Sequence, residues 1–124
     1  MKKTVEMVMT AHAHSINGEI PLAQAEKEMK ALGVRHLPVL LAGKIVGMLS
    51  DRDVKLMGKF SGNFTVEDAM TPDPYVVEPN AALAEVAGTM AEFRFGSAIV
   101  AQHGKILGIF TASDGLRMLA ASFR

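Results

Sequence analysis

The sequence contains one seven-residue pattern twice, at residues 47–53 and 108–114. Each copy reads glycine, two apolar residues, a hydroxyl residue, two variable residues and aspartate. We expect the glycine to let a strand end approach another group closely, and the hydroxyl to stand where a helix begins. Free N–H groups at a helix start attract phosphate, and a first-turn aspartate can accept hydrogen bonds from two ribose hydroxyls. The residues that could bind such a ligand are Ser50, Asp53, Thr111 and Asp114.

The same pattern also has a purely structural interpretation. Ser50-x-x-Asp53 and Thr111-x-x-Asp114 are capping-box sequences, each worth about 1 kcal/mol of stability. The two interpretations are compatible, because a capped helix start still presents backbone N–H groups to a ligand. A purely structural or dimerisation role therefore stays open.

Internal repetition extends over most of the chain. Sliding the sequence by 61 residues aligns it with itself without gaps. We place copy one at residues 1–60 and copy two at residues 61–124, with a linker at 58–63. The identical pairs include Val5 with Val66, Met9 with Met70, Leu22 with Leu83, Met29 with Met90, Val39 with Val100, Gly47 with Gly108, and Asp53 with Asp114.

Each copy predicts a short helix followed by the element order β-α-β-β-α. The strand pairs are nearly continuous apolar runs, typical of strands covered on both faces, and their tight turns place glycine at a positive φ. A single copy has too little core, so we expect an α+β fold whose two βαββα repeats pack about a pseudo-two-fold axis. The expected strands are 14–16, 36–41 and 44–49 in copy one, and 75–77, 97–101 and 105–110 in copy two.

The starts of the long helices are predicted from capping preferences. Asn80 is a good N-cap for the helix that carries Val86 and Met90. Pro21 suits the first turn of the corresponding helix in copy one. The last helix of each copy is expected to start at Ser50 or Thr111.

Composition excludes several classes of function. Thirteen basic residues balance thirteen acidic residues, which argues against a nucleic-acid or polybasic membrane partner. The absence of cysteine excludes disulfides, thiolate zinc sites and cysteine nucleophiles. With no signal peptide or membrane-length apolar run, we expect a cytoplasmic protein. His12 and His14 lack an obvious third metal ligand, and no catalytic constellation is present, so neither a metal site nor an enzyme is expected.

The ordered motifs resemble a known family. Val8-Met9-Thr10 and Ala69-Met70-Thr71 begin the copies, residues 33–39 precede the first hairpin, and both Gly-x-x-Ser/Thr-x-x-Asp segments follow in order. In this arrangement the sequence resembles a tandem pair of CBS domains (cystathionine-β-synthase-type repeats) over nearly its whole length. The resemblance implies a non-catalytic sensor that requires no cofactor. It would bind an adenosine nucleotide (AMP, ADP or ATP) in the cleft between the repeats and signal to an effector protein by conformational change.

The resemblance also implies roles for individual residues. The motif hydroxyls and carboxylates would bind ribose or phosphate, and residues near the first strand would cradle the adenine. Basic residues before the second strand would reach the phosphate. S-adenosylmethionine or a cyclic dinucleotide remains an alternative ligand. The implied ligand-binding residues are Ser50, Arg52, Asp53, Arg35, His36, Thr111, Asp114, Tyr75, Val76 and Val77.

Two further expectations follow. Copy two has Gly96, Ser97 and Ser113 where copy one has Arg35, His36 and Arg52, so we expect the Asp53 cleft to bind a phosphorylated ligand more tightly. We also expect a homodimer, formed through apolar faces of the last helices. These faces consist of Leu116, Leu119, Ala120 and Phe123 in copy two, and of Val54 and Met57 in copy one.

Overall fold

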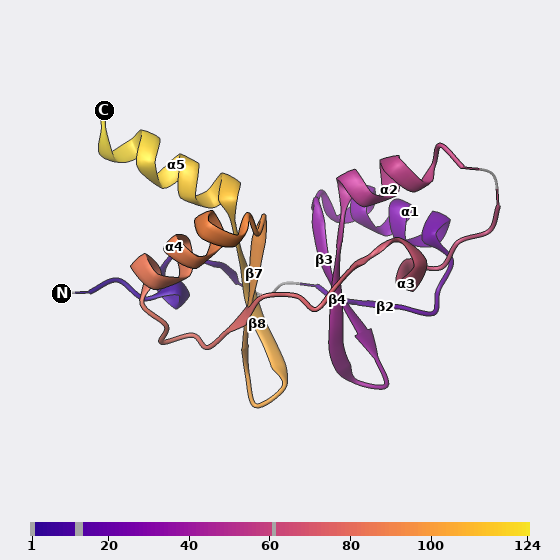
Figure 1. The fold of residues 1–124 in the computed structure, drawn as a ribbon, viewed down its shortest axis with the longest axis horizontal. Helices are drawn as coiled ribbons and strands as arrows, with labels where there is room; N and C mark the ends of the chain where they lie inside the picture. The colour runs from indigo at the N-terminus through magenta and orange to yellow at the C-terminus, as the bar shows by residue number, and fades with distance from the viewer. Residues whose placement is uncertain (1, 12–13, 61) are drawn as a thin grey trace. The chain divides into compact units, whose positions relative to one another are not determined.

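The computed structural model describes residues 2–11, 14–60 and 62–124. These residues form an α+β fold with two four-stranded sheets (Figure 1). The chain divides into two compact units. Met1–Ala13 together with Tyr75–Arg124 form one, which we name the Asp114 unit, and His14–Pro74 form the other, the Asp53 unit. Within the described residues, every helix is too short or too polar to cross a lipid bilayer.

The Asp53 unit is a sheet in the order β2-β3-β4-β5 with helices packed on it. Strand β2 runs parallel to β3, and the other neighbours are antiparallel. Its core joins apolar side chains of all three helices to Leu37, Val39 and Leu49. The elements are β2 (Ile16–Asn17), α1 (Leu22–Leu32), β3 (His36–Leu41), β4 (Lys44–Ser50), α2 (Asp51–Met57), α3 (Val66–Ala69) and β5 (Thr71–Pro72).

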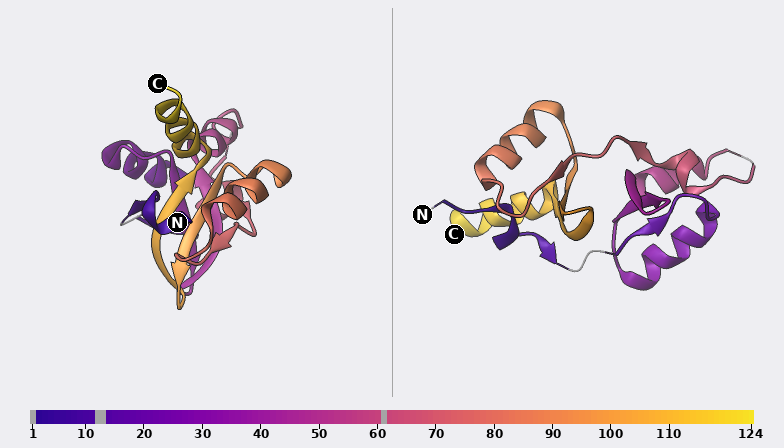
Figure 2. Two further views of the ribbon diagram at one scale, coloured as in Figure 1. Left: turned by 90° about the vertical axis from the view of Figure 1, so that its left-hand side faces the viewer. Right: turned by 90° about the horizontal axis from the view of Figure 1, so that it is seen from below.

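The Asp114 unit repeats this plan with the sheet order β1-β8-β7-β6. Its core contains Val5, Val86, Met90 and Phe110. Figure 2 shows the indigo N-terminal segment beside the orange and yellow elements from late in the chain. The elements are the 3-10 helix η1 (Val5–Met7), β1 (Thr10–Ala11), β6 (Val76–Val77), α4 (Leu83–Phe93), β7 (Ser97–Gln102), β8 (Lys105–Thr111) and α5 (Ala112–Ser122).

Each sheet is completed by a two-residue strand from the other sequence copy. Strand β1, from copy one, pairs with β8, with Thr10 opposite Ile109. Strand β5, from copy two, pairs with β4, with Thr71 opposite Met48. Sequence reasoning did not predict these two strands. The division between residues 60 and 61 describes the sequence repeat and stays a prediction. The compact units are divided differently, because the first segment of each sequence copy belongs to the unit built mainly from the other copy.

The hairpin turns have the expected backbone geometry. Gly43 and Gly104 have φ of 77° and 76°. The preceding residues, Ala42 and His103, are also at positive φ, 50° and 54°. Positive φ at both central residues is the signature of a type I′ turn, which matches the twist of the strands that it joins.

The predicted starts of α1 and α4 were wrong by one and two residues, respectively. The N-cap of α4 is Ala82 rather than Asn80, and Pro21 is the N-cap of α1 rather than part of its first turn. Neither helix has a side-chain cap. In each helix the first backbone N–H donates instead to a carbonyl oxygen far away in the sequence. The Leu83 N–H donates to the Lys3 oxygen, and the Leu22 N–H donates to the Phe64 oxygen.

Candidate functional site

Both motif segments form complete capping boxes. The Ser50 N–H donates to Asp53 Oδ2 at 2.9 Å, and the Asp53 N–H donates to Ser50 Oγ at 3.0 Å. The Thr111 N–H donates to Asp114 Oδ2 at 2.9 Å, and the Asp114 N–H to Thr111 Oγ1 at 3.1 Å. The structural interpretation of the pattern is therefore confirmed. The box uses Oδ2 of each carboxylate and leaves Oδ1 outside it.

The structure brings the basic residues predicted for copy one to the start of α2. The Asp51 N–H donates to the Arg35 carbonyl oxygen at 2.8 Å, and His36 stands opposite Ser50 in the sheet. Arg52 is the second residue of α2. Arg35 and Arg52 are exposed, and neither forms an ion pair with any described residue. His36 is half-buried and has an interaction of its own.

An aromatic cluster lies at the corresponding end of the Asp114 unit. The Ala112 N–H donates to the Gly96 oxygen at 3.0 Å, which places the start of α5 beside the start of β7. The Tyr75 carbonyl accepts from the Ile99 N–H at 2.8 Å, and the Tyr75 ring lies 5.3 Å from that of Phe95. Phe93 stacks on Phe95 at 5.6 Å.

The two phenylalanines were not among the predicted site residues. Comparison of the two copies could have found them. Copy one has the non-aromatic Leu32 and Val34 at the same positions, so the two aromatic rings are a feature of copy two alone. Val76 is exposed, whereas Val77 is half-buried. Val76 and Val77 form β6, which pairs with β7, and Tyr75 directly precedes that strand, whereas Thr111 stands opposite Ser97 on the other side of β7.

One residue near Asp114 was missed entirely. Arg117 Nη2 donates to Asp114 Oδ1 at 2.8 Å, so both oxygens of this carboxylate are engaged. The sequence could have predicted this ion pair, because an acidic and a basic residue three apart on a helix are neighbours. The counterpart of Arg117 in copy one is Leu56, and no described residue donates to Asp53 Oδ1.

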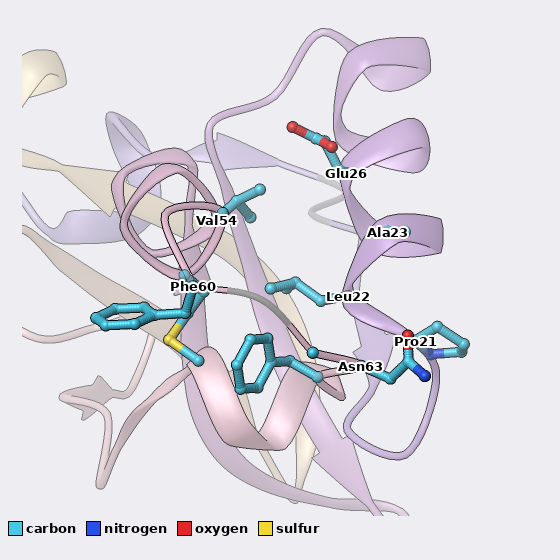
Figure 3. Close-up of a pocket in the computed structure, with 11 residues that line it drawn as sticks. Pro21, Leu22, Ala23, Glu26, Val54, Phe60 and Asn63 are labelled. Atoms are coloured by element: carbon cyan, nitrogen blue, oxygen red, sulfur yellow. The ribbon is translucent and has the colours of Figure 1, made fainter.

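A separate groove crosses the Asp53 unit between α1 and the end of α2 (Figure 3). Its volume is about 510 Å³. The predicted exposed face of α2 was wrong here, because Val54 is in the core and Met57 packs against it. Apolar residues dominate the lining, which consists of Pro21, Leu22, Ala23, Glu26, Val54, Met57, Gly58, Phe60, Gly62, Asn63 and Phe64.

No cluster of three or more histidine, aspartate or glutamate side chains suited to a metal ion occurs within residues 2–11, 14–60 and 62–124. His12 of the His-x-His pair lies outside these ranges.

Comparison with known proteins gives consistent matches. The family model described as CBS domain matches the chain twice, at residues 5–56 and 66–121. Inosine-5′-monophosphate dehydrogenase from Korarchaeum cryptofilum is 29% identical over 113 residues. That match covers 90% of this chain but only 23% of the dehydrogenase, so the chain spans less than a quarter of this relative.

Two solved structures share the fold. The crystal structure of CBSX2 in complex with AMP has a TM-score of 0.76 and 29% identity, covering 98% of each chain. The CBS domain pair of protein MJ0100, in complex with 5′-methylthioadenosine and S-adenosyl-L-methionine, has a TM-score of 0.88 and 20% identity. It covers 98% of this chain and 99% of that one, and the likeness concerns the fold alone.

Proposed function

The chain belongs to the CBS-domain family, and on that premise we propose that it is a non-catalytic regulatory module that binds AMP, ADP or ATP at its Gly-x-x-Ser/Thr-x-x-Asp motifs. The observation that carries the proposal is the state of Asp53. Its Oδ2 accepts from the helix cap, and its Oδ1 has no donor among the described residues. A ribose hydroxyl can donate to this oxygen without breaking a bond that the fold needs.

The nucleotide's phosphate would be held at the Asp53 motif. Arg35 and Arg52 flank the start of α2, and both are exposed and lack an acidic partner among the described residues. Charge-assisted hydrogen bonds from arginine to phosphate are among the stronger polar contacts in proteins. His36 stands opposite Ser50 in the sheet, next to this phosphate position.

Recognition of adenine would use the strand before each long helix. In the Asp114 unit the Tyr75 and Phe95 rings supply aromatic faces, and the exposed Val76 follows Tyr75 at the start of β6. Aromatic rings stack readily on a planar base. The complex of CBSX2 with AMP, at 29% identity, supports an adenosine ligand for this chain.

We infer a regulatory rather than a catalytic role. Both motif carboxylates have a structural role that supports this inference, because Asp53 and Asp114 each cap a helix. The dehydrogenase relative shares only the matched portion, so its activity does not carry over. The ligand would act on an effector protein in the cytoplasm by binding two conformations unequally.

We also propose that the module dimerises through α5. This helix has no buried residue, and Leu116, Leu119 and Phe123 are 66%, 53% and 82% exposed. Leu116 and Leu119 are three residues apart and lie on one face of α5, and Phe123 is its C-cap residue. A two-fold pairing of α5 with its counterpart in a second copy would cover that apolar face.

Isothermal titration calorimetry with AMP tests the proposed function. The full chain should bind AMP saturably, and a double variant, Asp53→Ala with Asp114→Ala, should not. Circular dichroism must show that the double variant is folded. Absence of binding by AMP, ADP and ATP to the wild-type chain would leave only the structural role for both motifs.

A further inference from the structure

The two carboxylates of the motifs differ in one contact. Asp114 is engaged at both oxygens, by the Thr111 N–H at Oδ2 and by Arg117 Nη2 at Oδ1. Asp53 is engaged at Oδ2 alone by the Ser50 N–H, and its Oδ1 has no donor among the described residues. The difference arises at one repeat position, which holds Arg117 in copy two and Leu56 in copy one.

We propose that Arg117 is a built-in competitor of the ribose at the Asp114 motif, so that this motif binds nucleosides more weakly than its carboxylate alone would. The inference rests on the proposed function of the motifs. A ribose diol that binds Asp114 through Oδ1 would have to displace the Arg117 guanidinium or share this oxygen with it. At Asp53 no such exchange is required.

The Arg117–Asp114 ion pair is weak enough for a ligand to displace, yet strong enough to change the affinity for that ligand measurably. The Arg117 side chain is 73% exposed, so the guanidinium can swing into water, whereas the Asp114 carboxylate is only 15% exposed. Exposed pairs of this kind change equilibria by about two- to fivefold. The competitor should therefore lower affinity at the Asp114 motif by that factor without closing the site.

Adenosine is the appropriate probe, because it has the ribose and base but no phosphate that Arg117 could contact. The full chain should be titrated by NMR, with the amide of Ala112 reporting on the Asp114 motif and that of Asp51 on the Asp53 motif. Both residues are the first of their helices. Arg117→Leu should tighten adenosine binding at the Ala112 reporter about two- to fivefold and leave the Asp51 reporter unchanged.

Matched variants separate charge from packing. Arg117→Gln keeps most of the length and should tighten binding as Arg117→Leu does, whereas Arg117→Lys should stay near wild type. The reciprocal change, Leu56→Arg, should weaken binding at the Asp51 reporter, and it leaves no cavity because Leu56 is 55% exposed. Added salt should tighten adenosine at the Ala112 reporter in wild type but not in Arg117→Leu, because salt screens the ion pair.

The outcomes distinguish this inference from the proposed function. If adenosine binds wild type and Arg117→Leu binds it equally or more weakly, Arg117 is no competitor and the inference is overturned. Weaker binding in that variant would instead make Arg117 a ligand contact. If adenosine moves neither reporter in any variant, the Asp114 motif binds no nucleoside and the inference is overturned, whereas the proposed function is decided separately by the calorimetry with AMP, ADP and ATP.

Discussion

A Cβ atom added to Gly108 would lie 2.5 Å from the carbonyl oxygen of Thr10. Thr10 belongs to β1, the strand that the first sequence copy contributes to the sheet of the Asp114 unit. Gly47 has the same relationship with Thr71 of β5, where the distance to the carbonyl oxygen would be 2.9 Å. The motif glycine therefore makes room for the exchanged strand and for the methionine that precedes it, Met9 or Met70.

The first prediction concerns this close approach. Gly108→Ala should lower the free energy of unfolding by about 1–3 kcal/mol, because the added methyl group would clash with a backbone carbonyl oxygen, which cannot move away as a flexible side chain can. Urea unfolding of the full chain measures it. Gly88→Ala is the matched control: Gly88 lies within α4 with nothing within 4 Å, so alanine should be neutral or stabilise by up to about 1 kcal/mol. Equal stability of Gly108→Ala and wild type would contradict the prediction.

Much of the fold was predictable because the sequence repeats itself. Asp53 and Asp114 fall on each other in the alignment of the copies, and both structural boxes form as their spacing predicts. The buried centres of β3 and β7 follow from continuous apolar runs. Local patterns of this kind are decided within a few residues of sequence.

The parts that sequence reasoning missed depend on distant partners. Strand β1 is too short to show a period and exists only because β8 lies beside it. Asn80 is a better cap by type than Ala82, but the Lys3 carbonyl already accepts the Leu83 N–H. Arg117 was visible as a helical neighbour of Asp114, yet the consequence for the carboxylate required the positions of both side chains.

The second prediction compares the two motif aspartates. Asp53→Ala and Asp114→Ala remove equivalent capping bonds, and Asp114→Ala also removes the exposed Arg117 pair, so each should cost about 1 kcal/mol in urea unfolding, with Asp114→Ala equal or slightly higher. Their effects on ligand binding should differ. Asp53→Ala should abolish the tightest AMP-binding event in calorimetry, whereas Asp114→Ala should leave it largely intact. The opposite ranking of the two variants would refute the expected strength of the Asp53 motif.

The third prediction assigns the phosphate to Arg35. Arg35→Ala should weaken AMP about tenfold or more and leave adenosine nearly unchanged, because a charged hydrogen bond contributes roughly 1.5–3 kcal/mol. Calorimetry with both ligands gives the ratio. Lys59→Ala removes an exposed cation from the same unit and should not discriminate between them. Equal loss of AMP and adenosine in Arg35→Ala would show that Arg35 supports the fold rather than the phosphate.

The fourth prediction tests the apolar face of α5. The full chain should be a dimer in light scattering at tens of micromolar, and Leu119→Asp should make it a monomer with an unchanged circular dichroism spectrum. A charge on that face would be buried without a partner in the dimer. Met7→Asp changes an apolar side chain of similar exposure, 61%, outside α5 and should remain dimeric. A wild-type monomer at these concentrations would disprove the prediction.

The most direct test of the proposed function is thermal unfolding of the full chain with a nucleotide panel: AMP, ADP, ATP, S-adenosylmethionine, GMP and GTP. A ligand at 100 times its dissociation constant adds about 2.7 kcal/mol of stability, which raises Tm by several degrees in a chain of this size. We expect that rise with at least one of AMP, ADP and ATP, little dependence on added metal, and no rise with GMP or GTP. A rise with the guanine nucleotides alone, or with no member of the panel, would contradict the proposal that this chain senses an adenosine nucleotide.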